Sequence, residues 1–496
     1  MNVGRVMAIA GAALFLAGSL LAQQSPPPEP TATPTPLPGA EHLLHIIELQ
    51  QQQLGEQQAL IEQQQRRLEE MQRTLESVSR RLAELEQKTT GEQAPAALEA
   101  RLKQLESSVS TKPELPPDVV SAGDFPGSFR IPGSDAAMKI GGWVWSSLVQ
   151  TFDALGSDDR FLTYSIPVEG TPEAGKGERL SLWAGPSKFN IDVRTPTEIG
   201  QMRAFIETDF AGPDKTLRLR HAYGQYSGLI IGQTWSTFSD PDADHEDIDF
   251  EGLNAENVQR QAQMRWTMPL REDLRLALAI EYPTASITGG QAVNQVPDLV
   301  GRLVRRIPDG HLQVSAVLRQ VRGELDTKPN VVETVTAWGL SGSGVVPMPK
   351  WNEKDRLIFQ VNAGKGIARY INDLNSAGGQ DAVFDPVTGE LTALFAYGAY
   401  VAYEHHWDFQ PNIPSFPFLN FSNLRSSLIL GHVNVHNIDA QDPTAYDKTN
   451  RFSLNLLWSP IPRVDLGTQF IYGNRQNKDG AQGSARQLQL RVRFFF

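Results

Sequence analysis

The sequence predicts an all-β transmembrane barrel of about 16 antiparallel strands, preceded by an α-helical coiled coil. The first observation is the segment 487–496, in which Leu, Val and Phe alternate with Gln and Arg. This period of two gives the strand one apolar and one polar face. The second is that the period of two begins near residue 129, whereas upstream residues repeat every seven. The third is that no apolar run of about 18 residues follows the N-terminal segment, which excludes helical membrane spans.

Residues 1–22 have the pattern of a secretory signal peptide. A short segment containing Arg5 precedes the apolar, small residues Val6–Ala22, and polar residues follow. We expect cleavage after Ala22, with Ser19 as the alternative, and a retained anchor helix as the alternative to a signal peptide. The chain contains no cysteine, which excludes disulfides and thiolate metal sites. The net charge of −12 argues against nucleic acid as a partner.

Residues 23–40 are rich in proline and predict an extended linker. Residues 41–110 follow with an apolar seam that predicts a coiled coil, whose first position holds Ile47, Leu54, Ile61, Leu68, Leu75 and Leu82. Glutamine fills the second seam position in the earlier heptads, a polar layer that can set the number of strands in the coil. A single solvated helix is the alternative. Residues 111–128 form a further linker.

Residues 129–496 predict the barrel, because candidate strands with period two follow one another to the C-terminus. The alternative, a soluble all-β domain, needs a second packed sheet to cover the apolar faces. The strands we expect are Lys139–Phe152, Leu180–Arg194, Gln201–Phe210, Leu217–Tyr226, Leu229–Trp235, Val258–Pro269, Asp273–Tyr282, Leu299–Ile307, His311–Arg322, Val331–Val346, Arg356–Tyr370, Leu391–Trp407, Leu424–Val435, Arg451–Trp458, Val464–Gly473 and Arg486–Phe496.

The connections between these strands differ in length. Residues 268–273, 308–310 and 459–462 are short and suit periplasmic turns, whereas 372–390 and 436–448 are long and polar and suit outer loops. Aromatic side chains near strand ends are expected to face outward and form girdles at the membrane interfaces. They are Trp143, Trp266, Tyr282, Trp407, Trp458 and Tyr472, and Trp145 is likewise expected to face outward.

A dense acidic segment follows the fifth expected strand. In barrels of about 16 strands the corresponding loop folds into the lumen, where carboxylates facing arginines create a field across the narrowest point. A solvated outer loop is one alternative. A calcium loop is another, but His245 occupies the position that requires glycine. The carboxylates expected at the constriction are Asp240, Asp242, Asp244, Glu246, Asp247 and Asp249.

Arginines on the polar faces of the strands are expected to line the lumen, since an arginine facing lipid costs about 2–4 kcal/mol at the midplane. Their planar fork suits bidentate binding of carboxylates. The alternative is a scaffolding role, in which they balance Asp192, Glu207, Asp209 and Glu281. In the eighth strand Arg302 cannot be assigned to a face. The candidate pore-lining arginines are Arg203, Arg218, Arg220, Arg265, Arg275 and Arg319, and Arg491 and Arg493 follow the same logic.

The sequence contains no sharp catalytic motif, so we expect neither an enzyme nor a cofactor or metal site. The close histidine pairs are His405 with His406, and His432 with His436. No cysteine or ordered carboxylate set completes a metal site around them. They are expected to belong to girdles or loops.

The order of segments resembles the DcaP-like outer-membrane porins. The matching stretches are Gly127–Gly133, Ile140–Trp143, Arg203–Phe210, Leu217–Tyr223 and Gly232–Phe238. The resemblance implies a homotrimer whose coiled coils join in the periplasm, and passive uptake of small anionic solutes such as dicarboxylates. It also implies a pore-lining role for the residues within matched stretches, Arg203, Arg218 and Arg220.

These observations predict a trimeric porin in the Gram-negative outer membrane, with the coiled coil in the periplasm. A terminal Phe496 after an alternating strand also resembles the signal that barrel-assembly machinery reads. The alternative function is structural: the coiled coil, about 70 Å long over residues 41–87, tethers the outer membrane to the cell wall through a plugged barrel.

Overall fold

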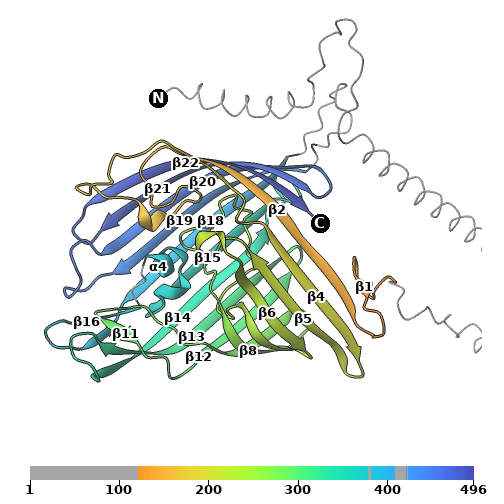
Figure 1. Ribbon diagram of the computed structural model, residues 1–496, viewed down its shortest axis with the longest axis horizontal. Coiled ribbons are helices and arrows are strands. Elements are labelled where there is room, and N and C mark those ends of the chain that lie inside the picture. The colour runs from red at the N-terminus through yellow and green to blue at the C-terminus, as the bar shows by residue number, and fades with distance from the viewer. Residues whose placement is uncertain (1–120, 378–380, 408–420, 422) are drawn as a thin grey trace, which may run out of the picture. The chain divides into compact units, whose positions relative to one another are not determined.

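A computed structural model describes residues 121–377, 381–407, 421 and 423–496. Sixteen antiparallel strands form a closed barrel in this part of the chain, which confirms the predicted barrel (Figure 1). The barrel closes where β2 (Ala137–Thr151) pairs with β22 (Gln482–Phe495), with Trp143 opposite Phe495. The predicted signal peptide, the Pro-rich linker and the coiled coil lie outside the described residues.

The remaining barrel strands follow in chain order around the wall, where β3 and β4 are two parts of one interrupted strand. They are β3 (Arg179–Trp183), β4 (Lys188–Thr197), β5 (Gly200–Asp209), β6 (Arg218–Tyr226), β7 (Leu229–Trp235), β8 (Arg260–Pro269), β9 (Leu274–Glu281), β12 (Asp298–Ile307), β13 (Gly310–Leu325), β14 (Val332–Pro347), β15 (Arg356–Lys365), β18 (Phe395–Trp407), β19 (Leu424–His436), β20 (Tyr446–Ile461) and β21 (Val464–Asn477).

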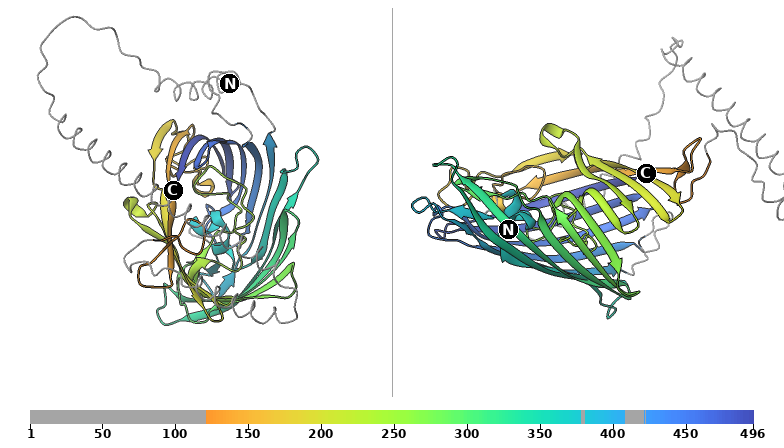
Figure 2. Two further views of the ribbon diagram at one scale, coloured as in Figure 1. Left: turned by 90° about the vertical axis from the view of Figure 1, so that its right-hand side faces the viewer. Right: turned by 90° about the horizontal axis from the view of Figure 1, so that it is seen from below.

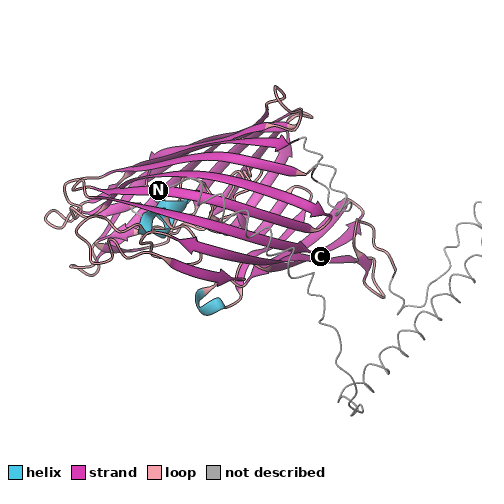
Figure 3. Cartoon of the chain, turned by 90° about the horizontal axis from the view of Figure 1, so that it is seen from above, coloured by secondary structure: helices cyan, strands magenta, loops and turns pink. Residues whose placement is uncertain are grey.

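Short elements lie between these strands, and Figure 3 shows that strands account for most of the regular structure. None of the described helices is both long enough and apolar enough to cross a membrane. The short elements are β1 (Phe129–Arg130), β10 (Ile287–Thr288), β11 (Gly290–Ala292), β16 (Ala382–Phe384), β17 (Leu391–Ala393), η1 (Thr163–Ser165), η2 (Pro213–Lys215), η3 (Ala368–Tyr370) and α4 (Asn372–Ser376).

The predicted alternation is realised as two chemically different surfaces of the wall. In β13 the apolar side chains of Leu312 and Val314 are exposed on the outside, whereas Gln313 and Ser315 are buried inside. In a bilayer the outer face meets lipid, so it tolerates apolar side chains that water would not. The inner polar side chains are buried because chain segments fill much of the lumen.

One expected strand is interrupted. Residues 180–194 were predicted to form a single strand, but β3 ends at Trp183 and β4 begins at Lys188, and both pair with β2. Pro186 lies in the gap and has no backbone N–H to donate to the sheet. The Ser187 hydroxyl replaces the missing ladder contact by accepting from the Trp145 backbone N–H at 3.0 Å.

Three segments fold inward and divide the lumen, as seen within the ring of strands in Figure 2. They are the connection 152–178, the inner loop 236–259, and the connection 366–394, which contains η3 and α4. Residues 372–390 were predicted to form a long, polar outer loop, but part of this connection folds inward, since Asn372, Asp373 and Leu374 are buried. Alternation is a local signal, and it does not reveal how a connection between strands packs.

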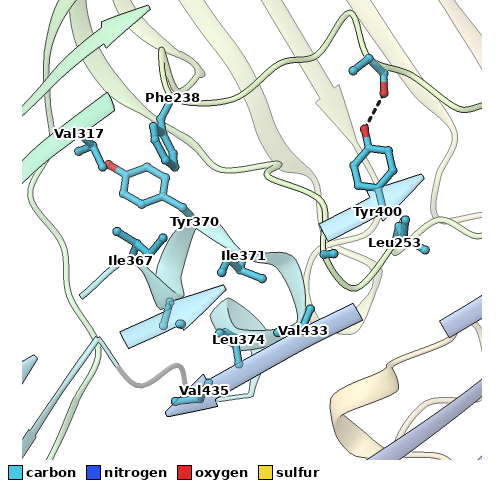
Figure 4. Close-up of a cluster of buried hydrophobic side chains, with 14 of the residues drawn as sticks. Phe238, Leu253, Val317, Ile367, Tyr370, Ile371, Leu374, Tyr400, Val433 and Val435 are labelled. Carbon is cyan, nitrogen blue, oxygen red and sulfur yellow. Dashed lines mark hydrogen bonds between the residues drawn. The ribbon is translucent and has the colours of Figure 1, made fainter. Parts of the chain in front are cut away.

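The inward segments pack into an apolar core against one side of the barrel. Tyr370 and Ile371 contribute from η3 and its C-terminal end, Leu253 comes from the inner loop, and Val433 comes from β19 (Figure 4). The Tyr400 hydroxyl donates to the Ala243 carbonyl oxygen at 2.9 Å and ties the inner loop to β18. This core fills the side of the lumen next to β13–β19, so open space remains along the opposite wall.

Candidate functional site

The inner loop crosses the lumen and is held near its beginning and near its centre. Near its beginning, the Asp240 carboxylate accepts from the Ser343 hydroxyl at 2.6 Å and lies 2.8 Å from Nε2 of His311. Near its centre, the Gln469 side-chain oxygen accepts from the Ile248 backbone N–H at 2.7 Å. The contacts connect the loop to β13, β14 and β21, so it narrows the barrel from within.

Arg451 is the main anchor of the loop centre. Its guanidinium is fully buried and lies 3.0 Å from Asp247 and 3.1 Å from Asp249. It also donates to the Gly252 carbonyl oxygen at 2.5 Å. Because the two carboxylates and the guanidinium are buried together, loss of the cation would leave unpaired buried charge.

A cavity of about 550 Å³ remains beside the inner loop. One side of the cavity is basic and belongs to the barrel wall and the 152–178 connection, and the other is acidic and belongs to the loop. The basic residues are Arg160, Lys188, Arg218, Arg220, Arg260, Arg491 and Arg493, and the acidic ones are Asp244, Glu246, Asp247, Asp249, Glu251 and Glu256.

Two buried carboxylates hold the basic wall in place. Glu207 lies 3.0 Å from Lys188 and 2.9 Å from Arg220. Asp209 lies 2.7 Å from Arg218 and 2.8 Å from Arg220. Three cations therefore share two carboxylates, which leaves positive charge facing the cavity.

Aromatic rings pack against cations of the basic wall. The Lys188 ammonium lies 3.7 Å from the ring centroid of Trp143, and the Arg260 guanidinium 4.3 Å from that of Trp235. A cation–π contact fixes a cation without accepting any of its N–H groups. The prediction that Trp143 and Trp145 face outward was wrong: Val144 is the exposed residue of this stretch, and both tryptophans line the cavity. The prediction failed because an alternation pattern counts tryptophan as apolar. The negative face of its ring also packs well against cations, so tryptophan can face a lumen lined by basic residues.

The acidic side of the cavity is buried enough to shift several pKa values. Burial raises the pKa of Glu251 to about 7, although the charge of Arg160 opposes the rise. Burial also raises the pKa of Asp249, whereas Arg451 holds that of Asp247 below its ordinary range despite burial. Loop carboxylates thus carry less negative charge at neutral pH than their number suggests.

His245 lies beneath these carboxylates in the inner loop. Its side chain is buried, and Nε2 lies 3.7 Å from Asp247. Burial alone would lower its pKa, but Asp247 and Glu256 raise it to about 9. His245 therefore adds a buried positive charge to the loop at neutral pH.

Residues 135–496 match the family model described as the DcaP outer membrane protein. The chain belongs to this DcaP family. The crystal structure of the outer membrane channel DcaP of Acinetobacter baumannii has the same fold, with a TM-score of 0.63 and 20% identity over 76% of this chain and all of that chain. The family resemblance inferred from sequence is thereby confirmed, and family and fold indicate an outer-membrane location.

Other solved barrels are more distant. OmpT of Vibrio cholerae is 9% identical with a TM-score of 0.45, over 73% of this chain and 99% of that chain. The anion-selective porin from Comamonas acidovorans is 11% identical with a TM-score of 0.46, over 73% of this chain and all of that chain. Nothing further about this DcaP-family protein follows from them. No curated relative matches the chain in sequence.

The predicted arginines of this DcaP-family protein fall into two groups. Arg218 and Arg220 line the cavity, whereas Arg203 pairs with Asp192 at 2.9 Å farther along the wall. Arg265 and Arg275 lie on the inner face, in β8 and β9, beyond the residues that line the cavity.

Arg319 has a different position from the one expected. Its side chain is buried, 2.9 Å from Asp298 and 3.1 Å from Asp381, and it donates to the Gly366 carbonyl oxygen. It connects β12 and β13 to the inward 366–394 connection. The contacts favour a scaffolding role, the alternative that the sequence left open, over contact with a solute.

The predicted carboxylates also separate. Asp244, Glu246, Asp247 and Asp249 line the cavity, and Glu246 pairs with Arg425. Asp240 and Asp242 lie at the beginning of the inner loop, away from the cavity. In the described part of the chain, no group of three or more His, Asp or Glu residues is arranged to hold a metal ion, which does not favour the calcium alternative.

Sequence reasoning missed three basic cavity residues. Lys188 opens β4 and Arg260 opens β8, while Arg160 lies in a connection. Lys188 shares the inward parity of Asp192, so the alternation in β4 could have revealed it. Arg160 had no such signal, because only tertiary packing brings its connection into the lumen. The structure also assigns Arg302 to the inner face with buried Val300.

Proposed function

We propose that this protein is a trimeric outer-membrane porin through which small hydrophilic solutes diffuse passively, with a preference for anions. The observation that carries the proposal is the cavity between the basic wall and the inner loop. Its seven basic residues face six acidic ones, and burial raises the pKa of Glu251 to about 7, so this carboxyl is partly neutral at neutral pH. The residues that line the cavity therefore carry more positive than negative charge, which attracts anions.

Opposite charges across the cavity also order solutes that carry both signs. The basic wall and the acidic loop create a transverse field, which aligns the dipole of a passing solute. Small carboxylates, including dicarboxylates, fit the basic side because each guanidinium can donate two parallel hydrogen bonds. No covalent chemistry is required for this passage.

The height of the barrel wall supports a trimer. β7 has seven residues and β6 has nine, whereas β13, β14 and β20 have 16 each. A tilted membrane strand needs about 9–11 residues. The barrel wall around β7 is therefore too short to span the hydrocarbon layer of the membrane. Leu229, Ile231 and Met264 are nevertheless exposed there, and a second copy of the chain would cover them.

Two further parts of the proposal concern the ends of the chain. We infer that the C-terminal Phe496 is read by the barrel-assembly machinery, since it directly follows β22, the strand that closes the barrel. The predicted coiled coil would join the three copies in the periplasm. A tether between membrane and cell wall is the competing function if the barrel does not conduct.

The test is single-channel conductance of the purified protein in a planar bilayer under a salt gradient. We expect stepwise openings in groups of three and a reversal potential that favours anions. Preference for cations would keep the channel but contradict anion selectivity. No conductance from a folded, heat-modifiable barrel would contradict the porin and favour the tether.

A further inference from the structure

Two arginines on the inner wall, Arg265 and Arg302, lie outside the cavity. Arg265 lies in β8, where Gln261 and Gln263 share its inward face and are buried. Arg302 lies in β12 on the face of buried Val300. Both lie between the constriction and the rim of short turns, which is the periplasmic rim in barrels of this kind.

One strand, β9, separates the two arginines in the wall. In the sheet register, Arg265 is opposite Ala279 of β9, and Arg302 is opposite Ala277 of the same strand. Alanine side chains are too short to separate the two arginines, so both can reach over β9 into the lumen. The two like-charged side chains therefore project into the same part of the lumen, on either side of β9.

The carboxylates near this pair are already engaged. Glu281 accepts from the Ser236 hydroxyl at 2.6 Å and the Thr237 backbone N–H at 2.6 Å. Asp240 is held by His311 and Ser343, as described above. Asp242 is exposed, and solvent therefore screens its charge.

The hydrogen-bonding capacity of the two arginines is correspondingly unfilled. In both Arg265 and Arg302 the Nε atom is buried and has no hydrogen-bond partner among the described residues. A buried donor without a partner is destabilising, and native proteins rarely leave one unsatisfied unless water or an ion occupies the place. Two such donors with like charges in one place favour an anion over water.

We propose that Arg265 and Arg302 form an oxyanion-binding subsite on the periplasmic side of the constriction. The ligand class is a small carboxylate or phosphate, whose oxygens accept from both guanidinium groups. The subsite rests on the proposed porin function and deepens it: an anion leaving the basic cavity would be received there before it reaches the periplasm. The basic cavity and the subsite would then be two weak anion sites in succession, an arrangement that lets an anion move on instead of remaining bound at one site.

The test uses inorganic phosphate as the probe and the full-length protein in detergent and in bilayers. The variant Arg265→Gln/Arg302→Gln removes both guanidinium groups. The variant Arg275→Gln/Arg306→Gln is the matched control. The control removes the same charge from the inner faces of β9 and β12, nearer the rim. Heat-modifiable migration on gels verifies that each variant is folded.

In bilayers, phosphate should reduce the chloride current of the wild type with a saturable dependence on concentration. We expect the Arg265→Gln/Arg302→Gln variant to raise the half-blocking concentration by about tenfold or more, and the control by less than about twofold. An unchanged value in the first variant, or equal shifts in both, would overturn the subsite, because only general charge would then matter.

A second measurement separates this inference from the proposed function. A ligand that binds the folded protein raises its unfolding temperature, with or without conductance. Phosphate should stabilise the wild type and the control in detergent, and the Arg265→Gln/Arg302→Gln variant markedly less, because only the basic cavity is left to bind it. If the wild type does not conduct yet is stabilised in this manner, the porin function fails and the subsite stands. If phosphate stabilises none of them, the subsite is wrong.

Discussion

At the residue scale, Glu251 shows how burial adjusts charge inside a water-filled barrel. Its carboxylate lies 3.5 Å from the Arg160 guanidinium, yet burial dominates and raises its pKa to about 7. The residue therefore changes charge within the pH range of most measurements. Because Glu251 lines the cavity, its ionisation alters the field that a solute meets.

Glu251 should make ion selectivity depend on pH. Below about pH 7 its carboxyl is neutral and anion preference is strongest, whereas ionisation at higher pH adds negative charge and weakens that preference. We expect the reversal potential to move toward cations between pH 5.5 and 8.5. The shift should be smaller in Glu251→Gln, whose charge cannot change. A full shift in that variant would assign the dependence to other groups.

The same carboxyl also links pH to stability. Its folded pKa lies above the ordinary value of 4.5, so the folded state binds the proton more tightly than the unfolded state. This contribution to stability is fully present below about pH 4.5 and is lost as pH rises through about 7.

At the element scale, the inner loop depends on contacts with strands far away in the chain. Asp249 accepts from the Gln489 side-chain N–H at 2.8 Å, and Arg451 connects the same loop to β20. These contacts, rather than regular secondary structure, hold the loop across the lumen. The width of the channel is therefore set by a small number of buried polar groups.

Arg451→Met should release the loop from β20. Methionine retains much of the length of arginine but leaves Asp247 and Asp249 without their cation, at a cost of about 3–5 kcal/mol. We expect a lower unfolding temperature and a larger single-channel conductance, measured on the same preparation. Arg486→Met is the control, since its pair with Asp153 is partly exposed and contributes about 0–1 kcal/mol. Equal effects of both substitutions would refute this account of the anchor.

Sequence patterns predicted strands better than connections. In β22, Leu488 and Phe494 alternate with Gln489 and Arg493, and this local pattern is sufficient to define the strand and its faces. The interruption between β3 and β4 was missed because residues on both sides of Pro186 retain apolar character. The inward path of residues 366–394 was missed because its burial depends on Arg319 and on the distant inner loop.

At the scale of the whole molecule, two independent observations support the proposal that copies of this chain associate. The low wall around β7 leaves apolar residues uncovered, and the heptads of residues 41–110 predict a coiled coil outside the described residues. The wall would place copies side by side in the membrane. The coil would fix their number, since its polar layer favours one oligomeric state.

The predicted coiled coil should strengthen the trimer. Replacing Ile61, Leu68 and Leu75 with Asp buries charge in the seam, so we expect the trimer to dissociate at a lower temperature than in the wild type. Mass measurement in detergent over a temperature series follows this change. The control replaces Ala59, Arg66 and Arg73 with Asp at outer heptad positions and should leave the trimer intact. A wild-type monomer at all temperatures would contradict the trimer itself.

The sequence by itself determined the barrel, because alternation of lipid-facing and lumen-facing residues is a local property that each strand carries independently. It also supplied the acidic loop and the inward arginines as candidates, since parity places Arg218 and Arg220 on the polar face. Only the tertiary structure decided which candidates share the cavity, that Trp143 faces inward, and that Arg319 is buried beside Asp298 outside the cavity. These outcomes depend on contacts between residues tens to hundreds of positions apart, which no local pattern encodes.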